Sequence, residues 1–113
     1  MAYSFLADKR GVQDLQILHE RLSQFELVEF FPVDISGELL TLGISIPFKA
    51  MDDARFENEL EKVMTYLIVE HKFQVTDLFT GNTIRVGDIA GLAKQVSGES
   101  FEGELWGQSL SSE

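Results

Sequence analysis

The sequence contains no cysteine and very little histidine, proline or tryptophan. Its 113 residues include two histidines, two prolines and one tryptophan. The absence of cysteine excludes disulfides, thiolate metal sites and cysteine nucleophiles. No apolar run approaches the ~18–20 residues of a membrane span, and no charged and apolar leader opens the chain. We therefore expect a cytoplasmic protein that has no membrane partner.

Basic residues are the other scarce class. Nine Lys and Arg residues stand against 19 Asp and Glu residues, which gives a net charge of -10. Because phosphate neutralisation by cations supplies most of the affinity for nucleic acid, this charge argues against a nucleic-acid partner. The composition is otherwise that of a globular domain, with 44% hydrophobic and 25% charged residues.

The length predicts one domain, and the charge distribution separates a tail from it. We expect a single α+β domain over residues 1–98 and an acidic tail over residues 99–113. The tail contains four glutamates and neither Lys nor Arg.

Hydrophobic periodicity predicts the secondary structure. A short apolar segment at 3–7 is a candidate strand, 8–11 reads as a loop, and apolar residues at helical spacing from Val12 to Phe25 predict a helix. Pro32 marks the next strand, 27–35, as an edge or bulged strand. After a turn at Ser36-Gly37, strict alternation over 40–48 predicts a strand with one buried face.

The second half is predicted to add two helices and two more strands. A long helix over 54–72 follows the candidate capping residues Asp52 and Asp53, and its inner stripe is apolar. Strands are predicted over 73–79 and 83–86 around a turn at 80–82. Asp88 is placed to cap a short helix that we expect to end at Gly98.

The resulting order is β-α-β-β-α-β followed by a β-α extension. Its first six elements match the ferredoxin-like plan, an antiparallel sheet with both helices on one face. Without the first strand, the order would be α-β-β-α-β-β-α. That alternative resembles the sandwich of the small acidic chaperones of bacterial secretion systems, with one strand missing.

No motif assigns a catalytic, cofactor-binding or metal-binding residue. His19 opens a stretch like the zinc-protease helix, but Ser23 stands where the second histidine is needed. His71 falls at the end of a predicted helix, where an end-capping role is expected. The loop after Asp77 lacks the acid or lysine of a phosphoryl-accepting site, and the Gly87-Asp88 turn lacks the lysine of a phosphate loop. We expect no cofactor, and the sequence favours a binding protein over an enzyme.

Two groups of residues are candidates for binding a partner. The first is a negative face of the long helix, and the second is a set of apolar anchors among the acids of the tail. The candidates are Glu57, Glu59 and Glu61 in the helix, and Phe101, Leu105 and Trp106 in the tail. Packing of the tail on its own domain, disorder, and docking on a second subunit or a partner all stay open.

The leading hypothesis is a non-catalytic, acidic protein-binding module of the inhibitor, immunity-protein or chaperone type found in bacteria, and the acidity favours a basic protein as its partner. The first alternative is a dimeric ferredoxin-like domain, paired through its sheets, that binds a small molecule or is an enzyme. A pocket lined by His19, Asp77 or Arg85 would favour that alternative. The second alternative is a structural subunit of a larger assembly, joined through the Trp106 tail.

Overall fold

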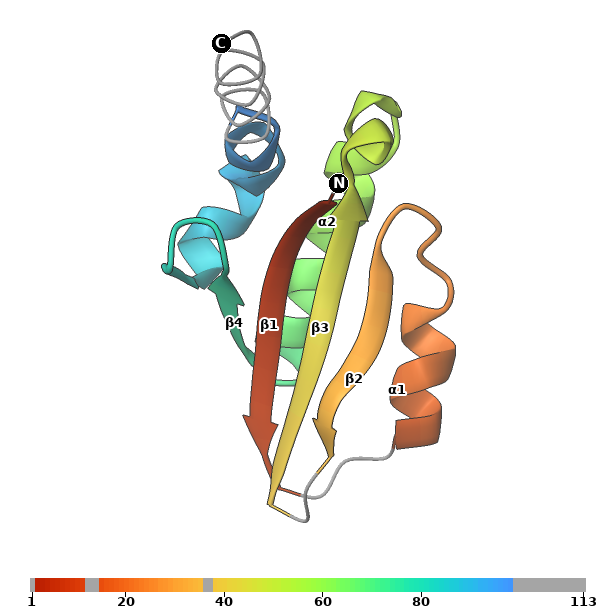
Figure 1. Cartoon of the computed structure of the whole chain (residues 1–113), viewed down its shortest axis with the longest axis vertical. Helices are drawn as coiled ribbons and strands as arrows, with labels where there is room; N and C mark the ends of the chain where they lie inside the picture. Colours follow the sequence, from red (N-terminus) through yellow and green to blue (C-terminus); the bar gives the residue numbers. More distant parts are fainter. Residues whose placement is uncertain (1, 12–14, 36–37, 99–113) are drawn as a thin grey trace, which may run out of the picture.

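A computed structural model describes residues 2–11, 15–35 and 38–98. Its centre is a five-stranded sheet in which every neighbouring pair of strands is antiparallel, in the order β2-β3-β1-β4-β5 (Figure 1). The strands are β1 Ala2–Arg10, β2 Glu29–Ile35, β3 Leu39–Pro47, β4 Gln74–Asp77 and β5 Thr83–Ile84. The predicted α+β class is therefore confirmed.

The first strand is the largest departure from the sequence-based expectation. β1 pairs with β3 along its whole length, from Ala2 opposite Pro47 to Arg10 opposite Leu39. The predicted loop at 8–11 is thus wrong over residues 8–10. These residues stay in the sheet because β3 offers a continuous row of backbone partners, and Thr41 Oγ1 of β3 also donates to Asp8 Oδ1 at 2.6 Å. Because β1 is a central strand, the alternative order that omits it is also wrong.

The ferredoxin-like topology itself is not confirmed. The sheet has five strands, and its order differs from that of the four-stranded plan because β5 continues the sheet beyond β4. The β-α extension that was predicted separately thus contributes β5 to the same sheet.

The edge position of the proline-containing strand is confirmed. β2 lies at one end of the sheet, and its register against β3 shifts between Pro32 and Asp34. Both features follow from Pro32, which has no N–H to donate to a ladder. The extra residue, Val33, is left out of the pairing.

The helices are shorter than the periodicity predicted. α1 covers Leu15–Leu22, so Phe25 lies beyond its end. The predicted helix over 54–72 begins later, as α2 Phe56–Met64, and continues as a π-helix, η2 Thr65–Glu70. It ends before Lys72, which has a left-handed backbone with φ of 59°.

Short helical segments complete the fold. The 3-10 helix η1 Phe48–Asp52 joins β3 to α2, and η3 Val86–Gly91 follows β5. Residues 92–98 are α-helical, so Gly98 is part of the helix and does not follow it as predicted. The predicted N-cap role of Asp52 and Asp53 is wrong, because the N-cap of α2 is Arg55 and no side chain caps this helix. Asp53 instead binds Arg55: its Oδ1 accepts the Arg55 backbone N–H at 2.8 Å, and hydrogen bonds from Arg55 lower the pKa of the Asp53 carboxyl.

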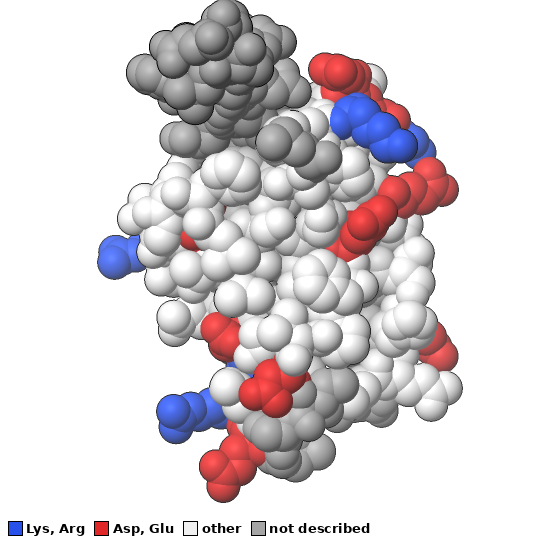
Figure 2. Space-filling model, in the orientation of Figure 1, with Lys and Arg blue, Asp and Glu red and all other residues white. Residues whose placement is uncertain are grey.

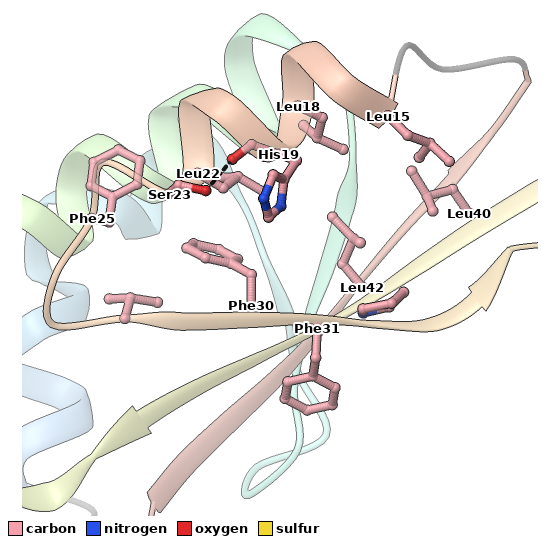
Figure 3. A pocket seen from close by; sticks show the side chains of 12 residues that line it. Leu15, Leu18, His19, Leu22, Ser23, Phe25, Phe30, Phe31, Leu40 and Leu42 are labelled. Carbon is pink, nitrogen blue, oxygen red and sulfur yellow. Dashed lines mark hydrogen bonds between the residues drawn. The ribbon is translucent and has the colours of Figure 1, made fainter.

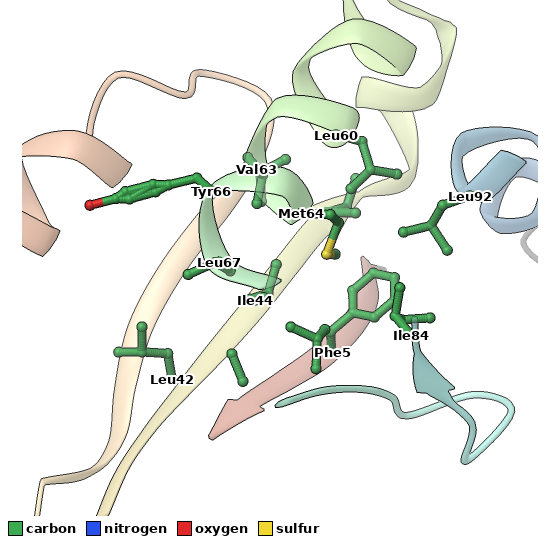
Figure 4. Packing of buried hydrophobic residues seen from close by; sticks show 14 of the residues in the cluster. Phe5, Leu42, Ile44, Leu60, Val63, Met64, Tyr66, Leu67, Ile84 and Leu92 are labelled. Carbon is green, nitrogen blue, oxygen red and sulfur yellow. The ribbon is translucent and has the colours of Figure 1, made fainter. Parts of the chain in front are cut away.

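The core lies between one face of the sheet and the α2–η2 helix (Figure 4). Phe5 of β1 and Ile44 of β3 are fully buried and face Leu60, Met64 and Leu67 across this layer. The apolar stripe predicted for the long helix thus packs against the sheet, and the alternating apolar residues of β3 form part of the surface that it covers.

The opposite face of the sheet carries no helix in the described residues. Figure 2 shows this face, with Asp, Glu, Lys and Arg gathered mainly toward its margins. Its centre includes Gly43 of β3, which is buried because the ring of Phe31, on the neighbouring β2, lies over it. A Cβ atom at Gly43 would lie 2.2 Å from Cε2 of Phe31. The prediction of a single buried face for β3 is therefore incomplete at this position.

The Gly43–Phe31 contact gives a test by two substitutions. Gly43→Ala is expected to displace the Phe31 ring and lower the free energy of unfolding by about 1 kcal/mol, the worth of an aromatic cross-strand contact. In a Phe31→Ala background the same change should be stabilising by roughly 0.5–1 kcal/mol, since glycine is unfavourable in a strand. Urea unfolding of the four proteins measures both values. If Gly43→Ala changed the free energy of unfolding equally in the wild type and in Phe31→Ala, the contact between Gly43 and Phe31 would be contradicted.

Candidate functional site

An apolar groove runs between α1 and β2 (Figure 3). Its volume is about 280 Å³, and the sheet forms its floor while α1 forms its roof. The residues that line it are Leu15, Leu18, His19, Leu22, Ser23, Phe25, Val28, Phe30, Phe31, Pro32, Leu40 and Leu42. Phe31 contributes from below, since its side chain points to the other face of β2.

The groove forms because one short helix covers the edge of the sheet only in part. Leu18 and Leu22 are buried, and Leu40 and Leu42 of β3 are buried beneath them. Leu15, in the first turn of α1, is 41% exposed. Pro32 is also exposed, and Phe30 is half-buried. Apolar side chains therefore line a site that stays open to solvent.

His19 and Ser23 are the polar side chains of the groove. Ser23 Oγ donates to the backbone oxygen of His19 at 2.5 Å, which satisfies the hydroxyl within α1. The imidazole of His19 points into the groove and has no hydrogen-bond partner among the residues that the structure covers. A single imidazole in an apolar groove can orient a ligand by one hydrogen bond, but it lacks the neighbours of a catalytic histidine.

Glu59 holds the end of the groove in place. Its Oε1 accepts the backbone N–H of Glu26 at 2.9 Å, and its Oε2 accepts that of Leu27 at 2.8 Å. These two amides belong to the connection between α1 and β2, which also carries Phe25 and Val28 of the groove. One of the predicted partner-binding residues thus has an internal role, which sequence spacing could not reveal.

Substitution of Glu59 is expected to loosen this connection. Glu59→Gln replaces one acceptor by an amide group that cannot accept an N–H, and should lower the free energy of unfolding by about 1–3 kcal/mol. Amide exchange at Glu26 and Leu27 should accelerate in parallel. Glu57→Gln is the matched control, because Glu57 is exposed on the same helix. Equal unfolding free energies for the two variants would contradict this role for Glu59.

The other predicted partner-binding residues are placed differently. Glu57 and Glu61 are exposed, and an interval of four residues puts them about 40° apart around α2. Glu59 lies about 160° from either of them by the same geometry, so the three acids do not share one face. Phe101, Leu105 and Trp106 fall outside the described residues.

A second, more polar cleft lies between α1 and the α2–η2 helix. Arg21 of α1 and Glu61, Lys62 and Glu70 of the longer helix contribute to its lining, together with the aromatic pair Tyr66 and His71. The Tyr66 and His71 rings stack with centroids 4.4 Å apart. Burial raises the pKa of the Tyr66 phenol, a nearby Arg21 opposes this, and Glu70 adds to it. Charges of both signs alternate here, so the cleft favours neither anions nor cations.

Asp77 and Asp88 both serve the backbone. Asp77 is fully buried, and its Oδ1 accepts the N–H groups of Phe79 and Thr80 in the predicted hairpin turn. Its Oδ2 accepts the hydroxyl of Tyr3 at 2.6 Å. Asp88 Oδ2 accepts the N–H of Arg85 at 2.9 Å, so Asp88 does cap a helix, but from the third position of η3 and not from a position before it. Neither Asp77 nor Arg85 lines the groove.

The part of the chain that the structure describes contains neither a metal-binding cluster nor a membrane-spanning helix. Within residues 2–11, 15–35 and 38–98, no group of three or more His, Asp or Glu residues is arranged to hold a metal ion. No helix in the same ranges is long and apolar enough to cross a membrane.

Comparison of the chain with protein-family models, with curated proteins and with solved structures gave no match.

Proposed function

We propose that this chain is a non-catalytic protein-binding module, and that the groove between α1 and β2 receives apolar side chains of a partner protein. The observation that supports this most directly is the groove itself, an apolar site open to solvent on an otherwise strongly acidic chain. Exposed apolar surface next to such a groove is typical of interaction sites.

The size and shape of the groove favour a protein partner over a small molecule. Its volume of about 280 Å³ lies just under the roughly 300–1,000 Å³ of typical small-molecule sites, which also enclose most of their ligand. An open groove instead accepts the side chains of a partner while the partner's backbone stays outside. A further apolar side chain follows Pro32 along β2, since Val33 is 54% exposed.

The net charge of -10 also supports a protein-binding function, because charge affects the rate at which two proteins associate. Complementary charge accelerates encounter with a basic protein and makes the association sensitive to salt. The exposed acids Glu57 and Glu61 and the acidic tail with Phe101, Leu105 and Trp106 stay candidates for additional contacts.

Affinity capture at low salt, followed by reconstitution with the purified partner, tests the proposal. Leu15→Glu introduces a charge at the mouth of the groove, and this position in the first helical turn tolerates an acid. We expect at least a tenfold loss of affinity for Leu15→Glu. Leu78→Glu, at a position that is 51% exposed and outside the groove, is the control and should bind like the wild type. Equal affinities for Leu15→Glu and the wild type would overturn the assignment of the groove.

His19 favours a second candidate function, the binding of a small apolar molecule with one polar group. Its imidazole is the side chain in the groove that could hydrogen-bond such a group. Native mass spectrometry of the purified chain would show a bound species whose occupancy falls in Leu15→Glu. A ligand-free spectrum together with retained protein binding would exclude this second function.

A further inference from the structure

We infer that the occupant of the groove is a basic amphipathic helix of a partner protein. This inference rests on the proposed function, since it names the chemistry of the partner at the same site. Three observations carry it: the backbone of β2, the arrangement of the apolar side chains, and the charge of the elements that form the groove.

The edge of β2 is poorly suited to bind an extended segment. Strand addition needs a regular row of free N–H and C=O groups along the edge. Pro32 removes one N–H, and the register shift after it leaves Val33 outside the regular pattern. A partner strand paired with β2 would therefore have its row of backbone hydrogen bonds interrupted in the middle of the groove. A helix satisfies its own backbone hydrogen bonds, so it needs only apolar contacts from this surface.

The apolar side chains of the groove suit a helical partner. Leu15, Leu18 and Leu22 follow one face of α1, and Phe30 faces them from β2. Two walls of apolar side chains with an open mouth resemble the sites that receive one face of an amphipathic helix. The anchors of such a helix recur at intervals of three and four residues.

The charge of the surrounding elements selects a basic partner. Residues 15–42, which include both α1 and β2, contain the five acids Glu20, Glu26, Glu29, Asp34 and Glu38. They contain Arg21 as their one Lys or Arg, so this stretch has a net charge of 1 - 5 = -4. Glu26 is already paired with Arg55 at 3.0 Å, whereas Glu20 of α1 and Glu29 of β2 are exposed on the two elements that form the groove. Glu29 shares the face of β2 to which Phe31 points, so its charge acts on a partner from beside the groove.

The same charge disfavours the two occupants that this chain could itself supply. The tail of residues 99–113 contains four glutamates and no Lys or Arg, so its apolar anchors would bring like charges to an acidic site. A second copy would bring a further net charge of -10. Repulsion of like charges acts against both, and attraction acts in favour of a basic segment.

Selection from a displayed library of randomised 16-residue peptides tests the inference with the full chain as bait. We expect the selected peptides to place apolar residues at i, i+3 or i+4, and i+7, and to contain more Lys and Arg than Asp and Glu. Circular dichroism of a synthetic selected peptide should show helix formation on binding. Its dissociation constant should rise at least tenfold with Leu15→Glu and severalfold with the double variant Glu20→Lys, Glu29→Lys.

Matched controls separate the charge of the groove from the charge of the whole chain. The double variant Asp52→Lys, Glu70→Lys changes the net charge by the same amount at exposed positions of η1 and η2 outside the groove, and should alter the dissociation constant less than twofold. A synthetic peptide of residues 99–113 is the acidic probe, and sedimentation of the chain alone reports a second copy. Binding of the acidic peptide at the groove, or self-association that Leu15→Glu abolishes, would overturn the inference.

The remaining outcomes distinguish the inference from the proposed function. Selected peptides that lose affinity with Leu15→Glu but are extended, neutral or acidic would overturn the basic helix and leave the groove as a protein-binding site. Selected peptides whose affinity is unchanged in Leu15→Glu, or a failure to select any peptide, would count against both.

Discussion

Replacing Asp77 by alanine is expected to lower the free energy of unfolding by about 3 kcal/mol, because three donors lose their acceptor and each unsatisfied buried group costs about 1–3 kcal/mol. The donors are the hydroxyl of Tyr3 and the backbone N–H groups of Phe79 and Thr80. Asp77 is fully buried, so water cannot readily replace its carboxylate. Equilibrium unfolding in urea measures the effect.

A double-mutant cycle measures how much of the stabilisation by Asp77 comes from its hydrogen bond with Tyr3. Tyr3→Phe alone removes one donor and should cost about 1–2 kcal/mol. In an Asp77→Ala background the same change removes a hydroxyl that has already lost this acceptor, so it should cost less than in the wild type. Asp77→Asn, which keeps an oxygen for the two turn amides, should be milder than Asp77→Ala. Additive effects of Tyr3→Phe and Asp77→Ala would show that the two side chains are not coupled.

The second large effect is expected at Phe5. Phe5 is fully buried between β1 and the α2–η2 helix, close to Met64 and Ile84 in the packed layer (Figure 4). Phe5→Ala should lower the free energy of unfolding by roughly 3–5 kcal/mol, the sum of lost burial and the cavity that remains. Thermal and urea unfolding measure this loss.

Phe31→Ala is the matched control for this prediction. The chemical change is the same, but the Phe31 side chain is 48% exposed and sits over Gly43 on the other face of the sheet. Its loss should cost about 1 kcal/mol. If the two phenylalanine variants were equally stable, the core would not be centred on the layer between β1 and the α2–η2 helix.

The stability of the groove and the stability of the core are expected to be separable. Phe5, Leu60 and Leu67 lie in the layer under α2 and η2, whereas Leu15 is part of a short helix with two buried residues. A charge at Leu15 should therefore change binding with little effect on folding. Glu59 is the exception, because it belongs to α2 and fixes the backbone that leads from α1 into β2.

Sequence patterns predicted the parts of the fold that depend on local periodicity. The alternation over 40–48 corresponds to β3 Leu39–Pro47, and the apolar stripe at helical spacing corresponds to the buried side of α2 and η2. Pro32 predicted the edge strand because the missing N–H is a property of that residue alone. The capping contact of Asp88 was predictable for a similar reason, since it acts within three residues of its own position.

Local pattern did not predict interactions between distant segments. Asp8, Lys9 and Arg10 are polar and read as a loop, yet β3 holds them in the sheet by backbone pairing. Glu59 was predicted to be part of an acidic surface, but its carboxylate reaches amides that precede it by 32 and 33 residues. The groove could not be predicted either, because its walls come from α1, β2 and β3, whose apolar residues each read as ordinary core.

The absence of cysteine and the excess of 19 acids over 9 bases are fixed by the sequence alone, and they determined the classes of chemistry open to this chain. Local periodicity, a further property of the sequence, determined most of its elements. Only the tertiary structure decided where acidity and apolar surface meet. The reason is geometric: α1 is too short to cover the edge of a sheet whose outer strand is interrupted at Pro32. An open apolar groove therefore remains beside the acids Glu20 and Glu29 of α1 and β2, whereas the sequence patterns located the acidic surfaces on the predicted long helix and in the tail.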